Sequence, residues 1–431
     1  MIDKIRIVKN YIYYRMKKYK NREQLEKYQK KKINKQLKFV TQKSKFYSTY
    51  KGKELEKFPI VNKKIMMENF NSLNTVNIDR DEALNLAIEC EKTREFTPKL
   101  KNVTIGLSSG TSNTRGVFLV SDEEKSQWAG YIISKILEDN IFKSTKVAFF
   151  MRANSNLYES VKSKKIIFEF FDIFKPMKEN IEKLKKFNAD ILVGQPSVLL
   201  EICKNVENNE IVKLPKKVYS IAEVLEENDA EYIKKTLNLD VIHQVYQCTE
   251  GCLAMTCKYG KIHLNEDIVF IEKEYLDEER FIPIITDFER KSQPIIRYRL
   301  NDILVEDKEK CKCGSCFTAL KKIEGREDDV FVFKGNNEEN IKVFPDFIRR
   351  CVLFADNVDE YRIVQQKDGN IIIYINNNIE VKSKIINEFE KLAYEMKFKL
   401  PKIEFEKYTY NKTKKLKRVE KIVQNVVGEM I

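Results

Sequence analysis

The stretch VTIGLSSGTSNTRGVFLV, residues 103–120, constrains the fold more than any other part of the sequence. Its two apolar ends, 103–107 and 117–120, are rich in Val, Ile, Leu and Phe, which favours β-strands. Hydroxyl side chains and Gly fill the loop between them. Ser121 then predicts a helix N-cap, and Glu124 completes a capping box three residues later. We therefore expect strand, loop, strand and helix in direct succession.

The surrounding sequence continues to alternate between strand and helix patterns. Further strands are expected at 146–151, 190–194, 217–222 and 240–246. Expected helices lie near 122–139, 158–170, 179–187, 196–206 and 227–238. From 262 to 305 the sequence is richer in strand patterns. This alternation favours an α/β fold with mixed, largely parallel sheets.

A second pattern begins after GREDD at 325–329. Its elements are expected in the order helix, strand, strand, helix, strand, at 344–355, 360–366, 370–376, 380–396 and 402–406. Such an order can form a compact α+β domain. The sequence therefore predicts a basic helical segment at 1–60 packed on the body, a large domain at 61–327 and a small mobile domain at 328–431.

Positive charge is concentrated in the first 60 residues. They hold 19 Lys and Arg against 5 Asp and Glu. The whole chain has 79 Lys and Arg and 65 Asp and Glu, so the other 371 residues hold 60 positive and 60 negative side chains. The net charge of +14 is thus a local feature, and we expect no nucleic-acid partner.

The same segment carries apolar residues at helical spacing. Six of them form an approximate stripe: Ile5, Val8, Ile12, Met16 and, further on, Leu25 and Tyr28. The stripe predicts a helix that packs on the body through these side chains and exposes a basic face. The alternative is a peripheral contact of the basic segment with a membrane surface or an acidic partner.

Composition disfavours several classes of protein. Hydrophobic residues make up 42% of the chain, which is enough for a large core. No run of about 18 uncharged apolar residues predicts a transmembrane helix, and the charged N-terminus does not look like a secretory signal. Nine Cys, an odd number, favour a reducing cytoplasm over a disulfide scaffold. With only His243 and His263, a His-based triad or a multi-His metal centre is disfavoured.

Three motifs together indicate a nucleotide site. LSSGTSNTRG (107–116) offers hydroxyls, backbone N–H groups and a cation to a polyphosphate, although it is not a Walker A loop. In YQCTEG (246–251), Glu250 could hold Mg²⁺, because hard cations take carboxylate oxygens. In RYRLND (297–302), the final Asp could accept the hydroxyls of a ribose. Alone, each motif also fits an ordinary turn or a solvated charge.

The order of the motifs is more informative than any one of them. GREDD and the Lys-rich NKTKKLKR (411–418) follow the other three, which is the signature order of adenylate-forming enzymes. Over roughly residues 55–420 the chain resembles this superfamily of acyl-activating enzymes. It looks most like the branch that contains phenylacetate–CoA ligases and capsule-biosynthesis adenylating proteins.

The resemblance implies roles for individual residues of the large domain. Six residues of the phosphate loop would contact ATP: Ser108, Ser109, Gly110, Thr111, Ser112 and Arg115. Thr249 and Glu250 match the Thr-Glu pair of the family, with Glu250 as the Mg²⁺ ligand and a catalytic role for the pair. Tyr246 would lie beside the adenine. Asp302 matches the ribose-binding Asp, and Arg326 matches an Arg that contacts ribose or phosphate.

The small domain carries the remaining implied residues. Asp328 matches the hinge between the domains, and Lys415 matches the catalytic Lys. Lys414 stands where a Gly usually precedes that Lys. Three neighbours therefore stay rival candidates: Lys412, Lys414 and Lys417. The phosphate loop also departs from the family pattern, since Asn113 replaces a Gly, a Pro is missing and the loop is one residue shorter.

A cluster of Cys and His predicts a zinc site. A Cys-x5-His pair and a Cys-x-Cys-Gly turn can close a tetrahedral site with four ligands: Cys257, His263, Cys311 and Cys313. The phenylacetate-type branch is similar in carrying a structural zinc there. Such an ion would hold together a strand-rich subdomain at about 250–320. Cys252 or Cys316 could replace a ligand, and a chance cluster of free Cys is the alternative.

The resemblance implies an ATP-dependent ligase. A small carboxylic acid would be activated to an acyl-adenylate on MgATP, with release of pyrophosphate, and then passed to a thiol of CoA or a carrier protein, or to an amine. The alternative is a catalytically degenerate scaffold, or a membrane-surface binding protein, built on the same fold. The sequence leaves the acid, the acceptor and the oligomeric state open.

Overall fold

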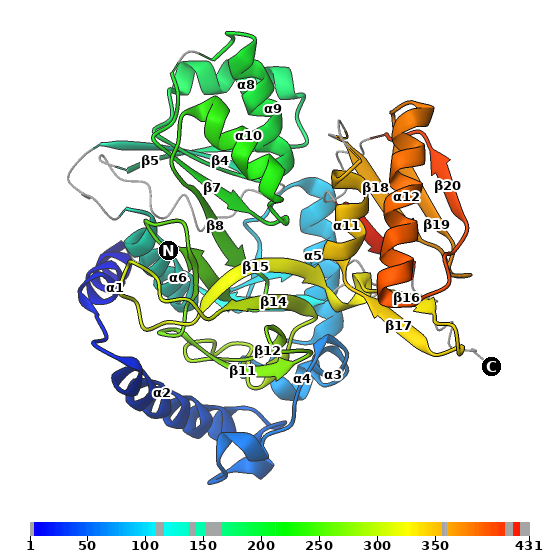
Figure 1. Cartoon of the computed structure of the whole chain (residues 1–431). Coiled ribbons are helices and arrows are strands. Elements are labelled where there is room, and N and C mark those ends of the chain that lie inside the picture. Colours follow the sequence, from blue (N-terminus) through cyan, green and yellow to red (C-terminus); the bar gives the residue numbers. More distant parts are fainter. Residues whose placement is uncertain are drawn as a thin grey trace. The chain divides into compact units, whose positions relative to one another are not determined.

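The computed structural model describes residues 4–108, 116–137, 144–151, 166–211, 213–355, 358, 360–409 and 417–422. The chain forms two compact units (Figure 1). Unit 1 comprises Met1–Leu300 and Val305–Lys322. Unit 2 comprises Asn301–Leu304 and Ile323–Ile431, so its continuous part starts a few residues before the predicted boundary at 328 and four earlier residues also belong to it.

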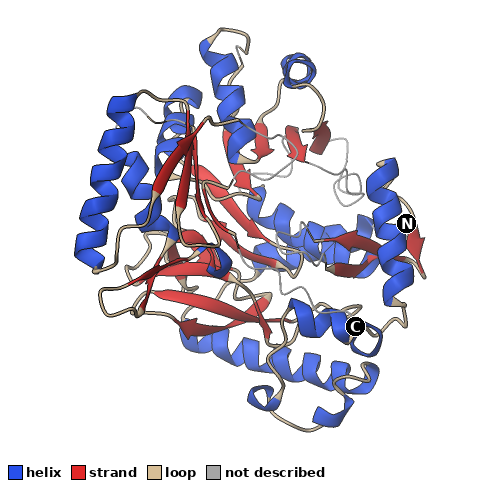
Figure 2. Ribbon diagram, turned by 90° about the vertical axis from the view of Figure 1, so that its right-hand side faces the viewer, coloured by secondary structure: helices blue, strands red, loops and turns tan. Residues whose placement is uncertain are grey.

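A mixed 12-stranded sheet contains most strands of unit 1, and Figure 2 shows the strands in red with helices beside them. The strand order is β11-β12-β14-β15-β10-β9-β8-β7-β6-β4-β5, with β13 paired to β12. The strands are β4 (Thr145–Met151), β5 (Ile166–Asp172), β6 (Ile191–Gly194), β7 (Lys217–Ile221), β8 (Ile242–Gln247), β9 (Cys252–Thr256), β10 (Ile262–Leu264), β11 (Val269–Tyr275), β12 (Arg280–Asp287), β13 (Tyr298–Arg299), β14 (Asp302–Asp307) and β15 (Ala319–Arg326). Strands β4 to β8 pair in parallel, whereas β8 with β9, β9 with β10 and β10 with β15 are antiparallel. The predicted α/β fold with mixed sheets is confirmed.

Helices pack against both faces of the parallel strands. One face is covered by α8 (Met177–Phe187), α9 (Pro196–Glu207) and α10 (Glu227–Leu237) (Figure 1). Val218 of β7 belongs to the apolar core under these helices. The next residue, Tyr219, points to the other face because side chains alternate along a strand. Its hydroxyl donates to the carbonyl of Ile136 (3.3 Å), at the end of α6 (Asp122–Ile136).

A three-stranded antiparallel sheet carries the stretch that opened the sequence analysis. It consists of β1 (Lys99–Leu100), β2 (Val103–Leu107) and β3 (Val117–Ser121). Three helices precede it: α3 (Lys63–Glu68), α4 (Phe70–Leu73) and α5 (Arg80–Thr93). Their apolar residues share a core with β2 and β3. The predicted capping box is confirmed, since the Glu124 N–H donates to Ser121 Oγ and the Ser121 N–H donates to the Glu124 carboxylate.

The N-terminal segment is helical, as the sequence predicts. It contains α1 (Lys4–Met16), α2 (Arg22–Lys43) and the short 3₁₀ turns η1 (Ser48–Tyr50) and η2 (Leu55–Lys57). α1 packs on α6 through a face that includes the buried Ile7 and Tyr14. Of the predicted packing stripe, Leu25 on α2 is buried, but the prediction is wrong over α1, because its four residues there are exposed: Ile5, Val8, Ile12 and Met16. The helix has two apolar faces, and the sequence pattern favoured the outer one.

α2 is joined to the later part of unit 1 by buried polar side chains. Gln29 Nε2 donates to the carbonyl of Glu266 (2.9 Å), and Gln36 Nε2 donates to the carbonyl of Arg290 (2.6 Å). Arg22 pairs with the buried carboxylate of Glu266 (2.7 Å). These contacts satisfy backbone and side-chain groups that burial would otherwise leave without partners.

Unit 2 has the predicted α+β order. Its elements are η3 (Glu327–Asp329), β16 (Phe331–Lys334), β17 (Asn340–Val343), α11 (Pro345–Leu353), β18 (Tyr361–Gln365), β19 (Ile371–Ile375), α12 (Ile379–Met396), β20 (Ile403–Glu406) and β21 (Val419–Lys421). A four-stranded sheet in the order β20-β19-β18-β21 packs with α11 and α12 around one apolar core, and β16 pairs with β17. The residues after GREDD thus form a core of their own.

One predicted helix, near 158–170, is wrong over the part that the structure describes. Residues Ile166–Asp172 form β5, which pairs in parallel with β4 along its whole length. The sequence IIFEFFD is dominated by β-branched and aromatic side chains, and these fit a pleated surface better than a helix. Residues 152–165 lie outside the described residues. Within the described parts of the chain, no helix is both long and apolar enough to cross a bilayer.

Candidate active site and metal centre

The phosphate-loop motif connects β2 to β3. The Ser108 N–H donates to the carbonyl of Gly116, and the Gly116 N–H donates to Ser108 Oγ, both across 2.8 Å. The Ser108 side chain therefore closes the base of the loop instead of pointing away from it. The other predicted ATP contacts lie outside the described residues: Ser109, Gly110, Thr111, Ser112 and Arg115.

The Thr-Glu pair lies in the turn from β8 to β9. The Cys248 N–H closes the turn on the carbonyl of Gly251 (3.0 Å). Thr249 Oγ1 donates to Glu250 Oε2 (2.7 Å), which orients one carboxylate oxygen of Glu250. Tyr246 is buried on β8, at a register shift between β8 and β9. The turn thus holds a carboxylate in a set orientation, and the role of Glu250 as a Mg²⁺ ligand stays a prediction.

A buried Arg that the sequence analysis did not select joins these two motifs. Arg290 is 1% exposed, and its guanidinium donates to the carbonyls of Thr249 (3.1 Å) and Leu119 (3.2 Å). Leu119 lies on β3, so one side chain links the Thr-Glu turn to the strand that leaves the phosphate loop. Arg290 also stacks over Trp128 and lies 3.9 Å from Glu124. No spacing rule in the sequence signals such a contact.

Two buried carboxylates hold Arg290 and its loop. Asp287 accepts from the N–H groups of Glu289 (2.8 Å) and Arg290 (2.9 Å). Burial raises the pKa of Asp287 to about 6, against the opposing effect of these hydrogen bonds. Glu124, the capping residue of α6, also accepts from the N–H groups of Lys291 (2.7 Å) and Ser292 (3.0 Å). The polar network therefore spans β3, α6 and the loop after β12.

In unit 2, the structure brings the predicted ribose residues together. Arg326 Nε lies 3.5 Å from Asp302 Oδ1, at neighbouring ends of β14 and β15. Asn301 Nδ2 donates to Asp328 Oδ2 (2.8 Å), and the Glu327 N–H donates to the carbonyl of Asn301 (2.7 Å). These bonds fix η3 to the start of β14. The proposed hinge at Asp328 stays a prediction.

One rival for the catalytic Lys has a structural partner. Lys417 Nζ lies 3.0 Å from Asp329 Oδ1, and the Asp329 carboxylate is largely buried. Burial raises the pKa of Asp329, and the charge of Lys417 opposes this effect. The other three candidates lie outside the described residues: Lys412, Lys414 and Lys415.

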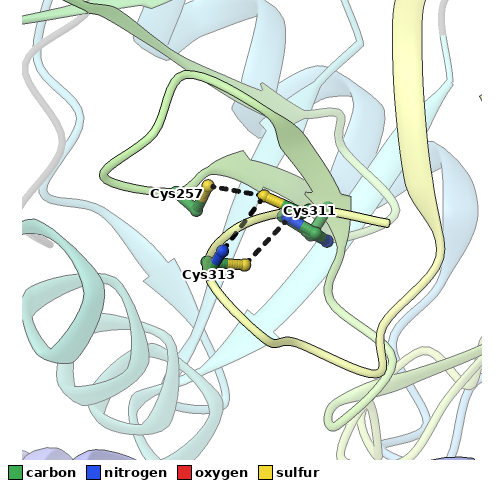
Figure 3. A group of neighbouring side chains, drawn as sticks. Cys257, Cys311 and Cys313 are labelled. Carbon is green, nitrogen blue, oxygen red and sulfur yellow. Dashed lines mark hydrogen bonds between the residues drawn. The ribbon is translucent and has the colours of Figure 1, made fainter. Parts of the chain in front are cut away.

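The four predicted zinc ligands converge. Their ligand atoms all lie within 4.8 Å of one another: Cys257 Sγ, His263 on β10, Cys311 Sγ and Cys313 Sγ. Figure 3 shows the three thiols turned toward a common centre. The Sγ atoms of Cys257 and Cys311 are 3.6 Å apart, and Cys313 Sγ lies 3.4 Å from His263 Nε2. Zn–S bonds of about 2.3 Å in a tetrahedron place sulfurs about 3.8 Å apart, so the donor set fits zinc.

The surroundings of this cluster also suit a metal. His263 Nδ1 lies 3.3 Å from the carbonyl of Phe317, the kind of contact that orients a metal-binding imidazole. Burial lowers the pKa of His263, which favours the neutral ring that binds metals. The N–H groups of Cys313 and Ser315 point at Cys311 Sγ (3.5 Å) and Cys313 Sγ (3.4 Å).

The two alternative ligands lie apart from the cluster. Cys252 is buried and accepts a contact from Asn265 Nδ2 (3.4 Å), and Cys316 does not belong to the group of converging ligand atoms. None of the nine Cys forms a disulfide.

No family model and no curated protein sequence matches the chain. Solved structures match its fold. A 2-hydroxyisobutyryl-CoA ligase, solved in the postadenylation state with 2-HIB-AMP, aligns with 94% of this chain and 89% of that chain, with a TM-score of 0.66 and 14% sequence identity. The chain has the fold of adenylate-forming enzymes.

Two further adenylate-forming enzymes support this assignment. An anthranilate–CoA ligase in complex with anthranoyl-AMP aligns with 71% of this chain and 63% of that chain, at a TM-score of 0.51 and 13% identity. Fatty acyl-adenylate ligases from E. coli and L. pneumophila give a TM-score of 0.51 at 10% identity, with 72% and 67% of the two chains aligned. The fold that the resemblance implies is confirmed, while membership of the superfamily and of the phenylacetate–CoA ligase branch stays a prediction.

Proposed function

We propose that the protein is an ATP-dependent ligase that converts a carboxylic acid to an acyl-adenylate and then passes the acyl group to a thiol. One observation carries this proposal. Over 94% of its length the chain aligns in structure with a CoA ligase that was solved with an acyl-AMP, and the TM-score is 0.66. The signature motifs occur on this fold in the expected order.

In the first step, a carboxylate oxygen of the acid attacks the α-phosphorus of ATP. A P–O bond forms, the bond to the bridging oxygen breaks, and pyrophosphate leaves with that electron pair. No covalent enzyme intermediate is required, so the protein acts by positioning the two substrates and by stabilising charge at the phosphates.

The residues of unit 1 are proposed to hold the phosphates. The loop based on Ser108 and Gly116 supplies hydroxyls and N–H groups, with Arg115 as its cation. Glu250, oriented by Thr249, is the proposed ligand for Mg²⁺, which supplies positive charge to the phosphate oxygens. Tyr246 is assigned to the adenine.

The residues of unit 2 are proposed to hold the ribose and complete the reaction. Asp302 accepts from the ribose hydroxyls, and Arg326, whose Nε lies 3.5 Å from the Asp302 carboxylate, adds a contact to ribose or phosphate. Lys415 stabilises the charge that grows during adenylation. Rotation of unit 2 about Asp328 would then bring in the thiol of CoA or of a carrier-protein phosphopantetheine.

Zinc is proposed as a structural ion in the cluster around Cys311. The site joins β10 and the end of β9 to the loop between β14 and β15, and its four protein ligands leave no position for a substrate. Its contribution is to the stability of the strand-rich part of unit 1. The chemistry is assigned to the motif residues alone.

The test is trapping of acyl-adenylate with hydroxylamine against a panel of aryl, amino and fatty acids. We expect ATP- and Mg²⁺-dependent hydroxamate with one class of acid. Asp302→Ala should weaken ATP binding by about tenfold or more, because the ribose hydroxyls lose a charged acceptor worth about 1.5–3 kcal/mol.

A matched control separates the ribose assignment from general damage to the surface. Asp307 lies at the other end of β14 and pairs with Lys261, so Asp307→Ala should leave ATP affinity unchanged. If no acid gives hydroxamate and calorimetry detects no ATP binding, the chain is the degenerate scaffold and the proposal is wrong.

A further inference from the structure

α1 has two apolar faces, and its inner face alone accounts for its packing. Ile7 and Tyr14 are buried against α6, and the Tyr14 ring meets Tyr131 edge to face at 4.9 Å. Gln127 Nε2 donates to the Tyr14 hydroxyl (2.8 Å), and Arg6 pairs with Glu123 (3.1 Å). These contacts attach the helix without any use of its outer stripe.

The contact between α1 and α6 is close, so α1 has a fixed orientation. A Cβ atom at Gly130 of α6 would lie 2.5 Å from Asn10 Cβ and 2.8 Å from the carbonyl oxygen of Ile7. Only Gly permits the two helices to approach this closely. Rotation that would bury the outer stripe against α6 would remove this fit.

The outer face of α1 presents a continuous apolar surface to solvent. Its residues are 47% to 81% exposed: Ile5 (81%), Val8 (54%), Ile12 (47%) and Met16 (76%). At about 100° per residue these four side chains fall within an arc of about 80°, and they extend over about 17 Å of helix. Side chains of this size and number are normally buried in a soluble protein.

Cations border this apolar surface on both sides. On the helix, Lys4 and Arg15 lie at one border of the arc and Lys9 lies at the other, and all three are exposed. Lys18 and Lys20 are exposed immediately after the helix. An apolar stripe between rows of cations is the pattern of a helix that lies in a lipid interface.

We infer that α1 is an interfacial anchor whose outer stripe inserts into an anionic lipid surface. The acyl chains would receive the four apolar side chains, and lipid phosphates would face the bordering cations. A nucleic acid offers phosphates but no apolar layer for the stripe. The net charge of +14 is concentrated in residues 1–60, and the rest of the chain is neutral. An anionic lipid surface would therefore attract this end of the chain.

The experiment is co-sedimentation of the full-length protein with vesicles of phosphatidylcholine alone or mixed with anionic phosphatidylglycerol. We expect binding to the mixed vesicles and little to phosphatidylcholine alone. Ile5→Ser with Ile12→Ser should weaken binding by at least about tenfold, because two large apolar side chains no longer insert. Lys4→Glu with Lys9→Glu should also weaken it, and high salt should reduce wild-type binding.

Two control variants match these changes in size and charge. Ile379→Ser with Tyr394→Ser removes two large exposed side chains from α12 (80% and 87% exposed) and should bind as the wild type does. Lys51→Glu with Lys57→Glu makes the same charge change elsewhere in the first 60 residues and should have a smaller effect than the Lys4 and Lys9 pair. Circular dichroism should show equal folding of all variants, since every changed side chain is exposed.

Several outcomes would overturn the inference. Two of these are wild-type protein that binds neither vesicle and a stripe variant that binds mixed vesicles as well as the wild type does. A dimer that the stripe variant dissociates, in a protein that ignores vesicles, would make the stripe a contact between copies. Binding of an acidic carrier protein in place of vesicles would make it a protein-docking surface.

Discussion

The guanidinium of Arg290 donates to the carbonyl oxygen of Thr249 across 3.1 Å, from a position that is 1% exposed to solvent. Its second donor reaches Leu119 on β3. A guanidinium spreads its N–H donors over three nitrogens in a fixed plane and so reaches two separated carbonyls at once, whereas the donors of a Lys all leave a single atom. Arg290 thereby sets the distance between the Thr-Glu turn and the strand that leaves the phosphate loop.

Replacement of Arg290 should destabilise unit 1. Arg290→Met leaves the carbonyls of Thr249 and Leu119 and the nearby Glu124 without this partner, so the free energy of unfolding in urea should fall by about 3 kcal/mol or more. Arg290→Lys should lose less of the free energy of unfolding than Arg290→Met does. Arg80→Met is the control, because Arg80 pairs with Asp81 on the surface, and it should change stability by less than about 0.5 kcal/mol. Equal stability of Arg290→Met and the wild type would contradict the bridging role.

Asp287 should make stability depend on pH. Its pKa is about 6 in the folded protein against a normal value of 3.8, so the folded state retains the proton to higher pH. The protonated Asp287 therefore contributes its full stabilisation of the folded state below about pH 4. This contribution is lost as the pH rises through 6, and the free energy of unfolding falls by about 3 kcal/mol as a result. Asp287→Asn carries no charge at any pH. Its stability relative to the wild type should therefore rise between pH 4 and pH 7, as measured by urea unfolding.

Asp277 provides a control of opposite sign. Burial opposes its ionisation, yet hydrogen bonds from the backbone of Arg280 and Glu279 lower the pKa of its carboxyl. The ionised Asp277 stabilises the folded protein at neutral pH, and this contribution is lost as the pH falls. The Asp277→Asn variant should therefore be least stable relative to the wild type at neutral pH. Parallel pH profiles for both variants would show that neither carboxyl titrates as described.

The metal site should be measurable in purified protein. Protein prepared without chelator should contain about one zinc per chain, and Cys311→Ser should lose the zinc and lower the Tm by about 5 °C or more. Cys316→Ser changes the same loop outside the converging cluster and should keep both zinc and Tm. Wild-type protein without zinc by mass spectrometry would refute the site.

Replacement of Lys417 should affect stability, whereas replacement of Lys415 should affect the rate of adenylate formation. Lys417→Ala leaves Asp329 buried without its cation, so unit 2 should unfold at lower urea concentration. Lys415→Ala should keep normal stability and slow adenylate formation by about a hundredfold, as expected for the loss of one charge-stabilising group. Adenylate formation that depends on Lys417 and not on Lys415 would shift the motif by two residues.

The elements that local pattern and chemistry determine were predicted well. The strands at 103–107, 190–194 and 217–222 are short apolar runs between turn residues, and all three form. Ser121 and Glu124 lie three residues apart, so their capping box needs no distant partner. The convergence of the three thiols and His263 could be expected because a Cys-x-Cys-Gly turn holds two thiols close together by itself, while zinc binding stays a prediction.

Features that depend on distant partners were not predictable in the same way. The inner face of α1 is set by the close approach at Gly130, about 120 residues further along the chain. Arg290 and Asp287 act on carbonyls and N–H groups that only the folded chain brings near them. The helix prediction at 166–170, by contrast, missed a local signal, because the β-branched and aromatic residues of IIFEFFD themselves favour the strand β5. The ATP, Mg²⁺ and hinge assignments stay predictions.

The anchoring of α2 has a consequence for synthesis of the protein on the ribosome. Gln29 donates to the carbonyl of Glu266, which lies 237 positions later in the chain. At about 5–20 residues per second, that partner emerges about 10–50 s after Gln29 has been made. During this interval the apolar side of α2 has no surface to cover. The nascent N-terminal segment therefore has to be kept from aggregation until the second half of unit 1 has been translated.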